Sequence, residues 1–109
     1  MTAKKSNETL HITQQFRAGR ARVYDFKWAA STLTVRVFPR ENEADPGDWR
    51  IEARTTDSPE ALVVAEWATT RTLALQQVGK SWDSKTGTHG LPAFDWDAVT
   101  RALVAVRAL

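Results

Sequence analysis

Apolar and polar residues alternate along residues 20–54, and this period of two restricts the fold of the chain more than any other feature. The alternation is clearest in the segments 22–28, 33–37 and 49–54, and a weaker version occupies 10–16. A period of two is typical of β-strands that bury one side against a core. We therefore expect three or four strands in the first half of the chain.

The links between these segments are short and contain residues that favour turns. Arg17-Ala18-Gly19 and Ala29-Ala30-Ser31 separate the first three segments, and Asp45-Pro46-Gly47-Asp48 suits a type II turn before the last. No link is long enough to hold a crossover helix, so neighbouring strands must run antiparallel. The sequence predicts a meander, with Tyr24, Phe26 and Trp28 facing the core.

The period changes after Thr56, and the rest of the chain predicts two helices. Ser58-Pro59-Glu60 is a helix start, and the apolar stripe that follows ends at Gly79, a natural helix stop. Thr69, Thr70 and Thr72 weaken the middle of this helix, where a break is tolerable. We read residues 80–90 as a loop, and Asp95 as the cap of a second helix that continues to Leu109.

These elements define an α+β fold: an antiparallel sheet of three or four strands in a meander, with two C-terminal helices packed on one face. We expect residues 1–8 to form a flexible tail and residues 9–109 to form a single domain. The chain has 109 residues, no cysteine, no secretory signal and no long apolar segment. We therefore expect a cytoplasmic protein that makes no membrane contact.

Charge is distributed unevenly along the chain. Residues 1–40 hold eight basic and two acidic residues, whereas residues 41–109 hold seven basic and eleven acidic residues. A basic half of this kind favours contact with an acidic partner or with the acidic half of another copy.

No set of residues predicts catalysis, a metal or a cofactor. The only histidines, His11 and His89, are far apart, and Ser84, Asp83 and His89 lack the rigid setting that nucleophilic catalysis needs. Residues 74–81 approach a phosphate-binding loop but lack its first glycine and a preceding strand. The acidic segment 41–48 lacks the ligand pattern of a calcium loop. The sequence therefore predicts a small, non-enzymatic binding module.

The leading hypothesis for its partner is single-stranded nucleic acid or another polyanion. Parity places several cations on the sheet face away from the core, where they could follow a phosphate backbone. Phe38 is the only aromatic residue that parity places on that face, so base stacking has little support there. The predicted nucleic-acid-binding residues are Arg17, Arg20, Arg22, Lys27, Arg36, Arg50 and Arg54.

The competing hypothesis is a protein–protein interaction or homodimerisation domain. It would use a free sheet edge together with Trp82, which follows the predicted helix stop and has no assigned core position. The structural alternative is that Trp82 folds back over the core, and we favour it because most tryptophan side chains are buried.

Overall fold

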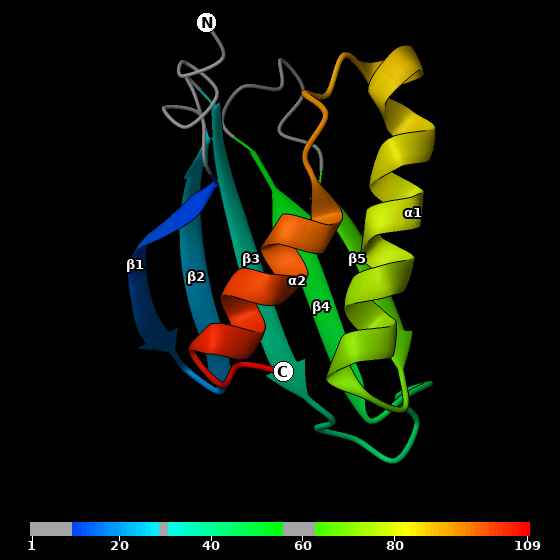
Figure 1. The fold of residues 1–109 in the computed structure, drawn as a ribbon. Coiled ribbons are helices and arrows are strands. Elements are labelled where there is room, and N and C mark those ends of the chain that lie inside the picture. The colour runs from blue at the N-terminus through cyan, green and yellow to red at the C-terminus, as the bar shows by residue number, and fades with distance from the viewer. Residues whose placement is uncertain (1–9, 29–30, 56–62) are drawn as a thin grey trace, which may run out of the picture.

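The computed structural model describes residues 10–28, 31–55 and 63–109, and these residues form five strands and two helices (Figure 1). The predicted tail 1–8, the link at 29–30 and the helix start at 58–60 lie outside the described residues. No helix in the described part of the chain is both long and apolar enough to cross a membrane. The elements are β1 (His11–Ala18), β2 (Ala21–Trp28), β3 (Ser31–Pro39), β4 (Trp49–Arg54), β5 (Val63–Ala68), α1 (Arg71–His89) and α2 (Trp96–Ala105).

The strands form one antiparallel sheet in which each strand pairs with its neighbours in the chain, in the order β1-β2-β3-β4-β5. Both helices follow the sheet and lie on one of its faces, with α1 packed on β4 and β5 (Figure 1). The predicted α+β meander with two C-terminal helices is confirmed. The predicted strand number is wrong, because the described sheet has five strands instead of three or four.

The additional strand, β5, comes from a segment that we expected to be helical. Val63, Val64 and Trp67 fit a helical stripe, but in the strand Val64 faces the core while Val63 and Trp67 lie on the opposite face. A strand that carries apolar residues on both faces loses the alternation that would identify it. The predicted weak point at Thr69 and Thr70 is where the strand ends and α1 begins.

The first helix begins and ends later than predicted. Thr70 is its N-cap and accepts a hydrogen bond from the Leu73 N–H at 3.1 Å, and Gly90 (φ 68°) ends it. Gly79 is not a stop: a Cβ there would lie only 3.0 Å from Cγ of Trp96, so the small residue lets the helices approach closely. Residues 74–81 lie inside this helix, which excludes a phosphate-binding loop at that position.

The second helix begins as predicted. The Asp95 carboxylate accepts hydrogen bonds from the N–H groups of Asp97 and Ala98, both at 3.1 Å. On the inner face of α2, Val99 and Leu103 are buried, and Trp96 and Val106 are half-buried. Sequence reasoning therefore identified both the cap and the inner face of this helix.

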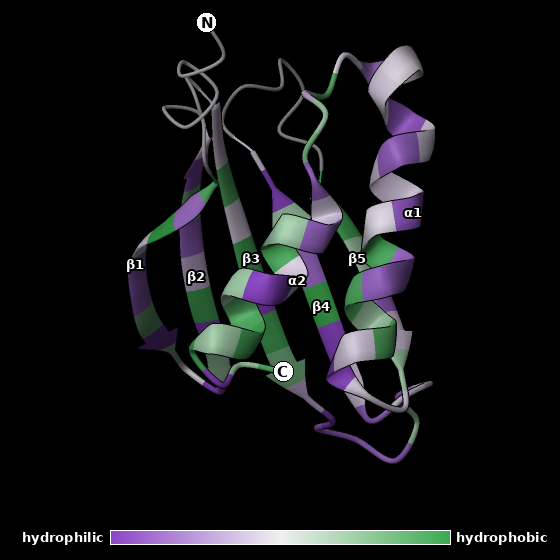
Figure 2. Ribbon diagram, viewed as in Figure 1, coloured by the Kyte–Doolittle hydropathy of each residue, from purple (hydrophilic) through white to green (hydrophobic). Residues whose placement is uncertain are grey.

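The core lies between the helices and the sheet, on the side that parity predicted. Tyr24 and Phe26 are buried and Trp28 packs against them, while Val35 on β3 lies opposite both Tyr24 and Ala53. Figure 2 shows the resulting alternation of hydrophobic and hydrophilic residues along the strands. The predicted burial of the β2 aromatic residues is confirmed for Tyr24 and Phe26, whereas Trp28 is half-buried at the end of the strand.

Trp82 also belongs to this core. Its side chain has no exposed surface, its indole N–H donates to the carbonyl of Pro92 at 2.9 Å, and its ring contacts Phe94 and Trp96. The hypothesis that Trp82 is an exposed interface anchor is wrong. The residue lies in the middle of α1, on the face that packs against the sheet and α2, and this helix was predicted to stop before it.

A register irregularity in β1 moves Phe16 away from its expected side. The pairing with β2 shifts between Ile12 and Gln14, so Phe16 lies opposite Val23 on the face away from the helices. Phe16 is 45% exposed there, whereas parity had placed it with Leu10 and Ile12 on the core side. A bulge inserts one residue and thereby reverses the parity of all that follow.

The acidic loop between β3 and β4 is held by hydrogen bonds between side chains and its own backbone. The Asp45 carboxylate accepts hydrogen bonds from the N–H groups of Glu41 and Asn42, and these bonds hold the pKa of Asp45 below its usual value. The Arg40 guanidinium donates hydrogen bonds to the carbonyls of Asn42 and Glu43 and forms an ion pair with the Asp48 carboxylate. The Asp45 carboxylate therefore stabilises the conformation of the loop.

Gly47 fixes this loop against β5, and its replacement by alanine should destabilise the protein. An added Cβ would lie 2.8 Å from the backbone nitrogen of Ala68, and backbone cannot move aside as a flexible side chain can. We expect Gly47→Ala to lower the free energy of unfolding by about 1–3 kcal/mol. The control is Gly87→Ala in α1, where an added Cβ meets open space. This change should raise the free energy of unfolding by up to about 1 kcal/mol. Thermal unfolding of both variants is the measurement, and equal effects would contradict this assignment.

Candidate functional site

The structure divides the seven predicted cations between two surfaces. Arg17, Arg20 and Arg22 lie at the β1–β2 hairpin, on the helix side of the sheet beyond the end of the core. The remaining four, Lys27, Arg36, Arg50 and Arg54, lie on the outer face, which is the sheet face without helices. The seven predicted residues therefore do not share one surface.

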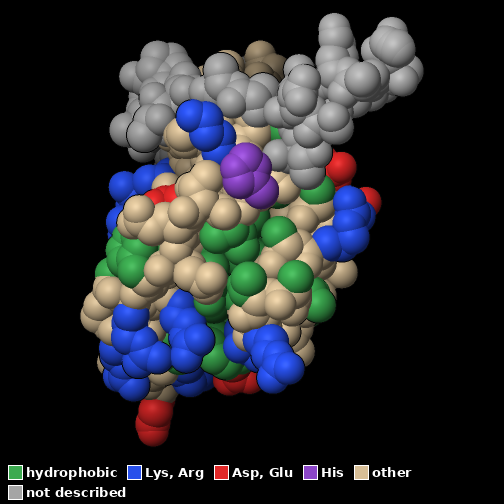
Figure 3. Space-filling view, turned by 60° about the vertical axis from the view of Figure 1, so that its left-hand side comes forward, with side chains coloured by type: hydrophobic (Ala, Val, Ile, Leu, Met, Phe, Trp, Pro, Cys, Tyr) green, Lys and Arg blue, Asp and Glu red, His purple; other side chains and the backbone are tan. Residues whose placement is uncertain are grey.

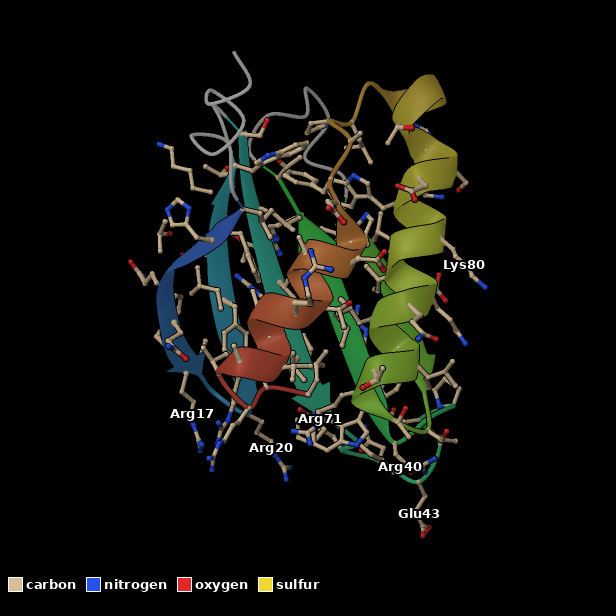
Figure 4. All side chains as sticks on the ribbon, in the orientation of Figure 1. Arg17, Arg20, Arg40, Glu43, Arg71 and Lys80 are labelled. Carbon is tan, nitrogen blue, oxygen red and sulfur yellow. The ribbon has the colours of Figure 1, made fainter. Side chains whose placement is uncertain are left out.

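The three hairpin arginines line a cleft of about 480 Å³. They are joined there by Arg71 from the start of α1 and Arg107 from the end of α2. Figure 4 shows Arg17, Arg20 and Arg71 at the same lower end of the molecule, and Figure 3 shows Lys and Arg side chains gathered there. We call this the arginine cleft, defined by its five arginines: Arg17, Arg20, Arg22, Arg71 and Arg107.

The described lining of the arginine cleft supplies no acidic side chain to balance its arginines. None of the described residues that line the cleft is acidic, and no described carboxylate forms an ion pair with its arginines. Arg17 and Arg22 lie directly opposite each other on paired strands. Like charges at such positions destabilise a sheet, so their presence is not explained by folding.

Arg71 adds a second unfavourable placement to the same cleft. It is the first residue of α1, where the helix dipole is positive and acidic residues are preferred, and the first turn contains none. Its guanidinium lies over the Trp49 ring, 4.8 Å from the ring centroid, which holds a planar cation at the cleft wall. The α1 N-terminus and Arg71 together raise the positive potential of the cleft.

A second hollow of about 230 Å³ lies beside β1, next to the arginine cleft. Arg17, Arg22 and Tyr24 line both hollows, so the two are neighbours. The remaining lining of the second hollow comes from Gln15 and Phe16. Together the two hollows, which we call the groove, extend from the start of α1 to β1, the edge strand of the sheet.

Three of the four predicted cations on the outer face are half-buried, whereas Arg17, Arg20 and Arg22 in the cleft are exposed. Arg50 forms an ion pair with Glu52 and also lies over the Phe38 ring, 5.4 Å from its centroid. Arg36 and Arg54 are half-buried, and their Nε atoms are buried without a hydrogen-bond partner. Lys27 is the one exposed cation among these four predicted residues. The predicted residues of the outer face therefore expose less positive charge than the arginine cleft does.

The outer face carries more aromatic surface than parity predicted. Phe38, Arg50 and Trp67 lie directly opposite one another across β3, β4 and β5. Phe16 is exposed on the same face, because of the β1 irregularity. The prediction that Phe38 is the only aromatic residue there is wrong, since it depended on a helical 63–68 and on unbroken parity in β1.

Sequence reasoning missed two of the five cleft arginines. Arg71 had a usable signal: it directly follows two threonines, one of which caps α1, so it occupies the first helical turn, where a cation is disfavoured. Arg107 had none, because nothing in the sequence places the end of α2 beside the β1–β2 hairpin.

Comparison of the chain with known protein families, with curated proteins and with solved structures finds no match.

Proposed function

We propose that this protein binds a phosphate-bearing polyanion, a single-stranded nucleic acid, in the arginine cleft. The observation that carries the proposal is the convergence of five arginines on one open cleft whose described lining contains no acidic side chain. They come from the β1–β2 hairpin, the start of α1 and the turn after α2. Guanidinium groups suit this ligand, because their planar donors bind phosphate oxygens in pairs.

The cost of assembling these cations supports a ligand over a purely structural role. Arg17 and Arg22 repel each other across paired strands, and Arg71 opposes the α1 dipole. A bound phosphate chain would relieve both interactions. Without an anionic ligand, the repulsion between Arg17 and Arg22 destabilises the folded state, whereas Arg71 keeps its stacking on Trp49.

The shape of the groove supports an extended chain over a compact anion. The cleft and the hollow beside β1 share three lining residues, and the half-buried Trp49 adds aromatic surface to the cleft lining. Single-strand-binding proteins combine a basic groove with aromatic side chains on which bases stack. A short anion such as free phosphate would fill only part of this groove.

Fluorescence anisotropy of a labelled oligo(dT) at low salt tests the proposal. We expect saturable binding that weakens steeply as salt is added, because phosphate contacts release counterions. Polyglutamate is the control polyanion, since it carries charge without phosphates or bases and should compete poorly. An absence of binding at tens of micromolar protein would reject the proposal.

A second candidate function, self-association through the outer face, is favoured by one observation. Phe16 and Val63 are 45% and 38% exposed on that face, together with the partly exposed Trp67. Phe16 lies on β1 and Val63 on β5, so exposed apolar surface is present at both edges of this face, where a second copy would contact it. Its cations could pair with the acidic 41–48 loop of another copy.

Light scattering over a range of protein concentrations tests self-association. We expect a dimer fraction that grows with concentration and decreases in Phe16→Ser, because the polar side chain removes exposed apolar area from the face. The comparison variant is Val104→Ser, which alters an exposed apolar residue on α2 instead of the sheet. A monomer at every concentration would remove this candidate.

A further inference from the structure

Arg107 adopts a backbone conformation that arginine disfavours. Its φ is 61°, and among the described residues it is the one non-glycine with a positive φ. The Arg107 N–H donates to the Val104 carbonyl at 2.9 Å and the Ala108 N–H donates to the Leu103 carbonyl at 2.8 Å. This is the Schellman arrangement that ends many helices, and its left-handed position is usually glycine or asparagine. A side chain with a Cβ is strained there.

The fold needs this turn but does not need arginine to make it. Glycine would adopt the same left-handed conformation without the Cβ clash and would preserve both backbone hydrogen bonds. Ala108, the next residue, is buried and anchors the chain after the turn. What arginine alone supplies is a side chain that lines the arginine cleft from the end of α2.

One structural explanation competes with a role in binding. A cation after the last turn of a helix is favoured by the helix dipole, and α2 has no basic residue in its last turn. That effect is small and screened by salt, and it could be obtained from an unstrained position within the last turn. The dipole therefore explains a cation near this end of the helix but not one at the left-handed position.

We infer that Arg107 is a ligand-contacting residue, kept in a strained conformation because it grips the phosphate backbone from α2 while Arg17 and Arg22 grip it from the sheet. This inference rests on the proposed function and deepens it, since it assigns the C-terminal end of α2 to the phosphodiester site. Strained residues of this kind concentrate at functional sites, where the surrounding structure holds them.

The test compares Arg107→Gly, Arg107→Lys and the unmodified protein in two measurements: binding of labelled oligo(dT) and thermal unfolding. We expect Arg107→Gly to bind about tenfold more weakly and to show a salt slope that is smaller in magnitude by about 0.7. Its midpoint of unfolding should stay the same or rise, because the strain is relieved. Arg107→Lys retains the charge and the strain, so it should lose less affinity and gain no stability.

The outcomes separate this inference from the function on which it rests. If the unmodified protein does not bind oligo(dT), the proposed function fails and the inference fails with it. If the unmodified protein binds and Arg107→Gly binds equally well, only the inference is overturned. A lower midpoint of unfolding for Arg107→Gly, with unchanged affinity, would assign the arginine to the helix end alone.

Discussion

Arg17→Glu is expected to weaken binding of a single-stranded oligonucleotide about 100-fold, because hydrogen bonds to charged groups contribute roughly 1.5–3 kcal/mol each and two arginines are affected. The new carboxylate removes the Arg17 contact and also pairs with Arg22, which lies directly across the strands. The same change should leave the fold intact. It replaces a repulsive cross-strand pair by an attractive one, worth about 0.2–1 kcal/mol in favour of the folded state.

The matched control for this prediction is Lys27→Glu, which makes the same change of charge on the same strand pair. Lys27 is exposed on the outer face, away from the arginine cleft. At physiological salt its effect should stay within about threefold, because charges beyond the Debye length are largely screened. Anisotropy titrations of both variants, with circular dichroism to verify folding, are the measurement. Equal losses would mean that binding follows net charge and not the cleft.

Trp82→Ala should produce the largest loss of stability, about 3–5 kcal/mol in the free energy of unfolding. The indole is fully buried and lies edge-on to Phe94 and Trp96, with ring centroids 5.7 Å away in both cases. Its removal leaves a cavity where α1, α2 and the segment between them meet. Small domains have only about 5–15 kcal/mol in total, so the variant should be close to unfolding.

Trp82→Phe separates ring packing from the indole hydrogen bond. Phenylalanine retains much of the buried ring but removes the N–H that donates to the Pro92 carbonyl. We expect this variant to lose about 1–3 kcal/mol, the cost of an unsatisfied buried group. Urea unfolding of both variants measures the difference. A loss below about 1 kcal/mol for Trp82→Ala would show that the residue is not part of the core.

The fold was predictable wherever one periodicity held without interruption. Alternation in β2, β3 and β4 located three strands and their buried side, and the Asp95 cap located α2. Prediction failed at β5, whose two apolar faces imitate a helical stripe, and at Gly79, which serves helix packing instead of helix termination. Both failures arise from tertiary contacts that override local preference.

The candidate site was predictable only in part, for a related reason. The three hairpin arginines were identified because they are clustered in the sequence. The other four predicted cations do not belong with them, because they lie on the outer face: Lys27, Arg36, Arg50 and Arg54. Strand parity alone places Arg22 on the side opposite Arg36 and Arg54, and the structure shows that this separation is real. Arg71 and Arg107 join the cleft through the docking of two helices, which no local pattern encodes.

The salt dependence of oligonucleotide binding tests the central claim most directly, because it counts phosphate contacts. For the unmodified protein we expect the logarithm of the association constant to fall with the logarithm of salt concentration with a slope of about −2 to −3.5, the value for three to five contacts on a single strand. The slope should move toward zero in Arg17→Glu and stay unchanged in Lys27→Glu. A slope near zero for the unmodified protein, or one that Lys27→Glu changes as much as Arg17→Glu, would contradict binding in the arginine cleft.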